Sequence, residues 1–166
     1  MSGRRAGVAL AIVHVALIGL LGLKLLADRA ALPRGWARTL PYDPSLPIRG
    51  RYVRLRLEVP LDSLSGDGAV RRGLDVRLEA GEGRLRGVTD GEGGGRAVTL
   101  DSAEGAPRAV LVQPVAFFIP EHIPDPSVRP AGEELWAEVT IPRRGPPRPI
   151  RLGIRKGGAL TPLDIR

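Results

Sequence analysis

The chain has 166 residues, which is enough for one domain and a targeting segment, and it carries 25 Lys and Arg against 18 Asp and Glu. Three of the cations (Arg4, Arg5 and Lys24) flank an N-terminal apolar segment, and only six residues are aromatic, so we do not expect a nucleic-acid-binding surface built on base stacking. The absence of cysteine excludes disulfides, thiolate nucleophiles and cysteine-ligated metals.

An uncharged apolar run extends from Ala6 to Leu23. In a helix, its roughly 18 residues would cover about 27 Å, close to the thickness of the hydrocarbon core of a bilayer. The run is longer than the apolar region of most cleavable signal peptides, and no small-x-small cleavage pattern follows it. The sequence therefore predicts an N-terminal tail (1–5) and an uncleaved transmembrane signal anchor (6–26). Cleavage and secretion are the alternative.

One face of this predicted helix carries small residues and a histidine, at spacings of four, three, four and four: Gly7, Ala11, His14, Ile18 and Gly22. Faces of this kind often pack against other helices in membranes. Because an ionisable group inside a membrane span is a functional candidate, His14 has two interpretations. It is either a neutral imidazole that hydrogen-bonds the backbone or another helix, or part of a proton relay.

The segment that follows, 27–49, is rich in proline, with Pro33, Pro41, Pro44 and Pro47. Because proline breaks helices and restricts the residue before it, we expect an extended tether here. Trp36 is expected at the membrane interface. Arg4 and Arg5 favour a cytoplasmic N-terminus. The cations after the span oppose it, but long domains are translocated largely regardless of flanking charge.

The clearest strand is Gly50–Pro60. Its apolar residues alternate strictly with polar ones over eight positions, which is typical of a half-buried strand. Further strands are expected at 73–79, 82–88, 96–100, 134–141 and 149–155, and along the long apolar segment 108–119, which Pro114 divides into 109–113 and 115–119. A last short piece at 159–163 is expected to close the sheet. Turn-forming residues separate them, so the sequence predicts an all-β body over 50–166. We expect an antiparallel sandwich or open barrel of about seven to eight short strands, preceded by one transmembrane helix.

The first strand and its approach resemble the GDYXXLXY family of bacterial membrane-anchored proteins. Gly50, Tyr52 and Leu55 match the motif, whereas Arg51 stands in place of Asp and Leu57 in place of the second Tyr. A second similar block includes Phe118, Pro120 and Glu121. The resemblance implies an anchor in the bacterial inner membrane, a periplasmic or otherwise extracytoplasmic domain and no particular activity. On physical grounds the motif is either structural, with a turn at Gly50, a sheet-edge Tyr52 and a core Leu55, or a binding element.

Catalytic chemistry has little support in the sequence. The only histidine of the body, His122, follows Glu121 in a proline-rich loop, and one histidine without cysteine does not build a zinc site. No serine lies in a nucleophile-elbow pattern, and the glycine run at 91–95 lacks phosphate-loop spacing. We therefore expect no catalytic residues, metal or cofactor.

The sequence favours a binding or accessory role for the body. Its expected contacts are the lipid bilayer, through the N-terminal helix, and an integral membrane protein. Nucleic acid is not an expected partner. Two alternatives stay open: an envelope hydrolase that uses Glu121 and His122, and a secreted soluble binding protein if the N-terminal segment is cleaved.

Overall fold

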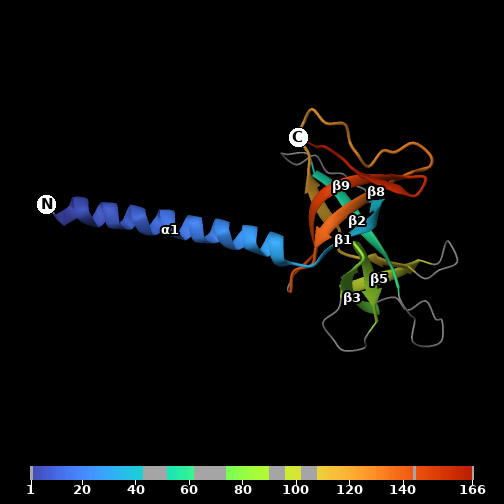
Figure 1. The fold of residues 1–166 in the computed structure, drawn as a ribbon, viewed down its shortest axis with the longest axis horizontal. Coiled ribbons are helices and arrows are strands. Elements are labelled where there is room, and N and C mark those ends of the chain that lie inside the picture. Colours follow the sequence, from blue (N-terminus) through green and yellow to red (C-terminus); the bar gives the residue numbers. More distant parts are fainter. Residues whose placement is uncertain are drawn as a thin grey trace. The chain divides into compact units, whose positions relative to one another are not determined.

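The computed structural model describes residues 2–42, 52–61, 74–89, 96–101, 108–143 and 145–165. The chain divides into two compact units, Met1–Leu32 and Pro33–Arg166. The first unit holds one helix and the second holds the strands (Figure 1). The bounds are α1 (Ser2–Ala31), β1 (Arg34–Pro41), β2 (Tyr52–Pro60), β3 (Leu74–Gly81), β4 (Arg84–Val88), β5 (Arg96–Asp101), β6 (Arg108–Leu111), β7 (Val115–Phe118), β8 (Glu133–Thr140), β9 (Arg148–Lys156) and β10 (Ala159–Pro162).

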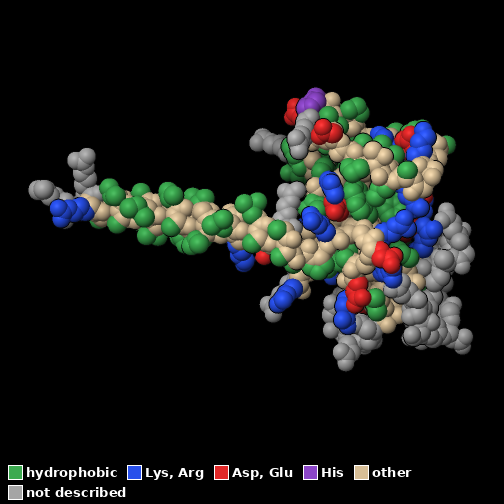
Figure 2. Space-filling view, viewed as in Figure 1, with side chains coloured by type: hydrophobic (Ala, Val, Ile, Leu, Met, Phe, Trp, Pro, Cys, Tyr) green, Lys and Arg blue, Asp and Glu red, His purple; other side chains and the backbone are tan. Residues whose placement is uncertain are grey.

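Helix α1 carries apolar side chains along most of its length, and its side chains from Arg5 to Ala27 are exposed (Figure 2). The stretch Arg5–Asp28 is long and apolar enough to cross a membrane, by length and composition. This finding agrees with the predicted N-terminal apolar helix. The helix is longer at both ends than the predicted span 6–26, and no proline occurs between Ser2 and Pro33 to end it earlier.

The predicted tether is wrong over residues 34–41, which form strand β1. Gly35, Ala37 and Thr39 are buried and alternate with partly exposed neighbours, so the strand has the two-residue period that the flanking prolines obscured. The two prolines suit the strand ends, where a missing N–H is tolerated, and the carbonyl of Pro33 accepts a hydrogen bond from the amide of Ile141 at 2.8 Å. Trp36 therefore lies in the sheet. Residues 43–49 of the predicted tether lie outside the described residues.

The strands form one sheet with the order β10-β9-β8-β1-β4-β3-β5-β6-β2-β7. Strand β1 also pairs with β2, so β1, β4, β3, β5, β6 and β2 close into a ring. Strands β8, β9 and β10 continue from β1, and β7 continues from β2. The pairings are antiparallel except for β1 with β4 and a single bridge between Leu61 and Gly87. The structure thus confirms an all-β body behind one apolar helix.

The core is formed by the alternating apolar residues of the strands, and the four predicted core positions of β2 (Val53, Leu55, Leu57 and Val59) are all buried. Gly87 lies so close to the side chains of Val76 and Leu61 that an added Cβ would meet them at 2.6 and 2.8 Å. The predicted break at Pro114 is also observed, because β6 ends at Leu111 and β7 begins at Val115. The ring is therefore filled by side chains.

Two strands depart from the simple alternation that we predicted. In β8, Trp136 and Glu138 were expected on the face opposite the core, yet both are buried. In β2, Glu58 was expected on the polar face, yet only 5% of its side chain is exposed. Both departures have the same cause, since arginine side chains from neighbouring strands cover these faces. Of these buried residues, Glu58 and Trp136 line the candidate site.

Candidate functional site: an arginine-rich cleft around Trp136

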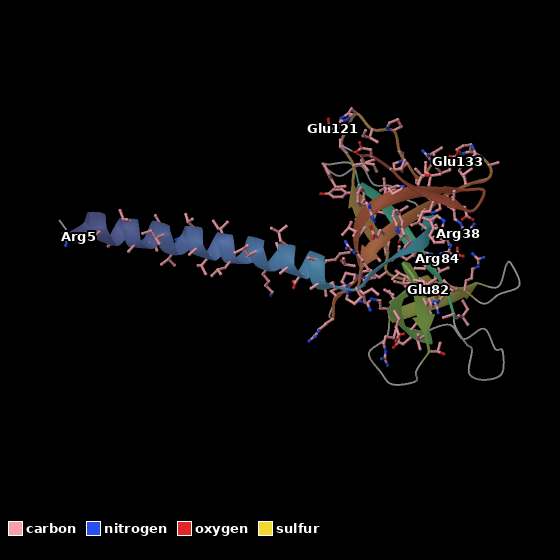
Figure 3. All side chains as sticks on the ribbon, viewed as in Figure 1. Arg5, Arg38, Glu82, Arg84, Glu121 and Glu133 are labelled. Carbon is pink, nitrogen blue, oxygen red and sulfur yellow. The ribbon has the colours of Figure 1, made fainter. Side chains whose placement is uncertain are left out.

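A cleft of about 250 Å³ opens where β1, β2, β4, β6, β8 and β9 approach one another. Pro60 lines it, together with Ala37 and Leu85, whose side chains are almost fully buried in the core. The other lining residues are two tryptophans, four arginines and two glutamates: Trp36, Trp136, Arg38, Arg84, Arg108, Arg155, Glu58 and Glu134. Figure 3 shows Arg38 and Arg84 side by side on this part of the body.

The strand register brings these residues together from distant parts of the chain. Arg38 of β1 pairs with Glu58 of β2 on one edge and with Trp136 of β8 on the other. Trp36, two residues earlier on the same face, pairs with Arg84 of β4. Because side chains two residues apart in a strand share a face, Trp36 and Arg38 line the cleft together.

Glu58 is a buried carboxylate held by two arginines. Its Oε1 accepts hydrogen bonds from Nη1 of Arg108 at 2.6 Å and from Nη1 of Arg38 at 3.5 Å. Burial of a carboxylate is costly unless charged donors compensate for the lost water, and these two guanidinium groups do so. Glu58 therefore has a structural task, which is to tie β2 to β1 and β6.

Glu134 is also fully engaged. Its Oε1 lies 3.3 Å from Nε of Arg38, and its Oε2 accepts a hydrogen bond from Nε1 of Trp136 at 3.0 Å. The second contact satisfies the only polar atom of the indole and fixes the orientation of the ring. Both carboxylates of the cleft thus have partners within the cleft itself.

The guanidinium groups of Arg84 and Arg155 lie over the ring of Trp136, at 5.9 and 5.1 Å from its centroid. Among the described residues, no carboxylate forms an ion pair with either group. The lining residues comprise four arginines and two glutamates, so the cleft carries an excess of two positive charges. Guanidinium groups bind carboxylates and phosphates with paired hydrogen bonds. The arrangement is therefore suited to binding an anion.

A second tryptophan–arginine pair borders the cleft. Arg151 lies 5.5 Å from the centroid of the Trp36 ring and forms an ion pair with Glu138. An added Cβ on Gly153 would meet this ring at 2.9 Å, so glycine at that position makes room for Trp36. Away from the cleft, burial lowers the pKa of Arg96, whose Nη2 donates to the carbonyl of Gly145 at 2.6 Å.

The structure joins two of the residues that the family resemblance singled out. Tyr52 and Phe118 are cross-strand partners in β2 and β7, and their ring centroids are 5.6 Å apart in an edge-to-face arrangement. Their side chains are 52% and 57% exposed. Leu55 and Leu57, in contrast, are fully buried, which agrees with the structural interpretation of those positions. Gly50 and Arg51 lie outside the described residues.

The other predicted candidates lie apart from the cleft. Glu121 and His122 are exposed in a turn closed by a hydrogen bond from the amide of Ile123 to the carbonyl of Pro120 at 3.2 Å. Figure 3 shows Glu121 well separated from Arg38 and Arg84. In the described part of the chain, no group of three or more His, Asp or Glu side chains is placed to hold a metal ion.

The residues proposed for helix packing (Gly7, Ala11, His14 and Gly22) are exposed on α1. A ring nitrogen of His14 donates to the carbonyl of Leu10, four residues earlier, at 2.9 Å. A hydrogen bond to the backbone is what we expect if His14 is a neutral imidazole rather than part of a proton relay. Neither Gly7 nor Gly22 of this face has a neighbouring atom of the described residues within 4 Å of an added Cβ.

The sequence analysis missed the cleft, although part of its pattern is visible in the printed sequence. Trp36 and Arg38 alternate with Ala37 and Thr39, as expected of a strand with one polar face. Comparison with protein-family models, with curated proteins and with solved structures finds no match. The resemblance to the GDYXXLXY family therefore stays a prediction.

Proposed function

We propose that the protein is a single-pass, membrane-anchored binding domain whose β body acts as an accessory partner of an integral membrane protein. In this proposal α1 crosses the bacterial inner membrane with its N-terminus in the cytoplasm, and the body lies on the extracytoplasmic side. The helix also contacts the lipid bilayer directly. The observation that carries the proposal is the short connection between the two units. Only Leu32 and Pro33 separate α1 from β1.

This connection limits how far the body extends from a membrane that α1 spans. The candidate span ends at Asp28 and β1 begins at Arg34, so the residues between them reach at most about 17 Å and would keep the body close to a membrane that α1 crosses. Strand β1 also pairs with β2, β4 and β8, and the anchor is therefore continuous with a central strand of the sheet rather than with a loose end. A rigid body at the membrane surface is well placed to bind another membrane protein.

The exposed pair Tyr52–Phe118 is the contact surface that we propose for this partner. Aromatic side chains are enriched in protein interfaces because they bury a large area at a low entropic cost. The cross-strand register of β2 and β7 holds both rings in place. Inside the membrane, the face with Gly7, Ala11, His14 and Gly22 supplies a second contact.

Purification of the full-length chain in mild detergent tests the proposal. We expect an integral membrane protein to co-purify, and we expect the double substitution Tyr52→Ala with Phe118→Ala to reduce its recovery. The matched control replaces two other exposed apolar residues, Val112→Ser with Val128→Ser, and should retain the partner. Equal recovery with both double variants, or no co-purifying membrane protein, would contradict the proposal.

Orientation and processing need a separate experiment. Protease added to spheroplasts should digest the body and leave α1 protected, and mass spectrometry should find the N-terminal segment intact. A protected body would reverse the proposed topology. A mature chain that begins after α1 would replace the anchored protein with a secreted one.

A further inference from the structure

We propose that the cleft around Trp136 is a binding site for a phosphate group, with Arg84 and Arg155 as its principal ligands. The inference rests on the geometry and charge of the cleft and does not depend on the partner proposed above. The ligand chemistry is that of a phosphate monoester, which is found both in soluble phosphorylated metabolites and in phosphatidic acid.

The charge of the cleft indicates this class of anion. Glu58 and Glu134 are engaged by Arg38, Arg108 and the Trp136 indole at the distances given above. Two positive charges are then left without a counterion from the described residues. A phosphate monoester carries a charge of about −1.5 to −2 near pH 7, which matches this excess more closely than the single charge of a carboxylate.

The two cationic groups line the same cleft from strands that are distant in the sequence. Arg84 belongs to β4 and Arg155 to β9, and both lie over one ring. Because both residues line one cleft, an anion bound there would be attracted by two positive charges. Stacking on Trp136 orients both groups while leaving their N–H donors available for hydrogen bonds.

The backbone on both sides of the cleft is held firmly. Gly35 packs against Arg84 so closely that an added Cβ would lie 2.8 Å from the Arg84 carbonyl carbon, and the amide of Trp36 donates to the carbonyl of Gly83 at 2.9 Å. Arg155 is the register partner of Glu134 in the β8–β9 ladder. Arginine side chains that project from paired strands lose little conformational freedom when an anion binds, which favours a specific site.

The cleft also has room for the group that carries the phosphate. Its volume of about 250 Å³ exceeds what one phosphate needs, and Pro60 and the rings of Trp36 and Trp136 provide an apolar wall. This wall suits a short carbon chain such as the glycerol unit that soluble glycerol phosphate and phosphatidic acid share.

The test uses the full-length chain in nanodiscs made only of phosphatidylcholine, titrated calorimetrically with glycerol 3-phosphate and with inorganic phosphate. We expect saturable binding, and we expect the double substitution Arg84→Gln with Arg155→Gln to weaken it by a factor of at least ten, because each lost charged hydrogen bond costs about tenfold or more. The double substitution to lysine, which keeps the charge but not the paired donors, should give an intermediate loss.

The matched control is Arg54→Gln with Arg148→Gln. Both residues are exposed arginines in strands, and Arg54 also lies over an aromatic ring, 5.2 Å from the centroid of Tyr42. This control removes the same charge outside the cleft and should bind like the parent protein. Tryptophan fluorescence melting curves of all variants verify that the body is folded.

A second arm replaces part of the phosphatidylcholine with phosphatidic acid. If soluble phosphates bind in pure phosphatidylcholine, the site accepts a soluble ligand. If only phosphatidic acid raises the melting temperature of the body, and this rise requires Arg84 and Arg155, the ligand is the lipid headgroup. An equal loss in the cleft and control variants, or no binding in either arm, would overturn the proposal.

Discussion

At the scale of single residues, Glu58 has the clearest energetic role. It is 5% exposed and receives hydrogen bonds from Arg38 and Arg108. Replacing it with alanine leaves two guanidinium groups without this carboxylate, so we expect a loss of about 1–3 kcal/mol in the free energy of unfolding. Urea unfolding followed by tryptophan fluorescence measures this loss in the body, because both tryptophans, Trp36 and Trp136, lie there.

Glu79 provides the control for this substitution, since its side chain is exposed on β3. Its replacement by alanine should change the unfolding free energy by less than about 0.5 kcal/mol. A similar effect at both positions would show that the buried ion pairs of Glu58 contribute nothing specific.

Gly35 is the residue at which an added methyl group should be most disruptive near the cleft. Its Cβ would lie 2.8 and 2.9 Å from the carbonyl carbon and oxygen of Arg84, which are backbone atoms that move only with the strand. We expect Gly35→Ala to destabilise the body by about 1–3 kcal/mol through overpacking. Gly81→Ala is the control, because its nearest neighbour would be Arg86 Nε at 3.7 Å, an ordinary contact. Equal melting temperatures for the two variants would contradict this expectation.

At the scale of elements, the β3–β4 hairpin contains a non-glycine residue in an unfavourable conformation. Glu82 has φ 51° and Gly83 has φ 73°, as in a two-residue turn of type I′. Asparagine adopts positive φ more readily than glutamate, so Glu82→Asn should stabilise the body slightly, by up to about 0.5 kcal/mol. The ion pair that it removes, with Arg86 at 3.6 Å, is exposed and contributes little.

A substitution at Glu82 that disfavours positive φ tests whether the turn conformation explains the effect. Glu82→Val places a β-branched residue at positive φ and should destabilise the body by about 1–2 kcal/mol. Thermal unfolding of the two variants should therefore shift in opposite directions. Shifts of the same sign would indicate that the turn conformation is not what decides the effect.

The strands could be predicted where a local pattern decides them. Strand β2 alternates without interruption, and Pro114 marks the gap between β6 and β7, so both were located from the sequence. Strand β1 was missed because the prolines at 33 and 41 suggested a tether, whereas they only mark the two ends of the strand. Local patterns thus locate strand interiors better than strand ends that carry proline.

The candidate cleft could not be predicted, because it depends on contacts between distant residues. Trp136 and Glu58 each occupy the polar face of an alternating strand, and nothing nearby in the sequence indicates that the face is covered. Their burial follows from Arg84, Arg108 and Arg155, which the sheet brings in from other strands. The sequence indicates Tyr52 and Phe118 only as two separate motif positions, because their contact depends on the register between β2 and β7.

At the scale of the whole molecule, the division into two units leads to a prediction about truncation. Because the body Pro33–Arg166 is compact by itself and α1 carries the candidate span, deletion of residues 2–31 should move the protein from the membrane fraction to the soluble fraction. The melting temperature of the body, followed by tryptophan fluorescence, should change by only a few degrees. A truncated body that stays with membranes would assign membrane binding to the strands.

The pairing of β1 with β8 has a consequence for biosynthesis. Arg34 and Thr140 are register partners, so β1 cannot form this pairing until β8, about a hundred residues later in the chain, has been synthesised. Until then one edge of β1 is open to pairing with other chains, and long-range pairing of this kind is slow. A chain that crosses a membrane in an unfolded form can complete its sheet only after β8 has emerged on the far side. If the body is translocated as proposed, it would fold after translocation, and chaperones that shield open strand edges would then have most effect.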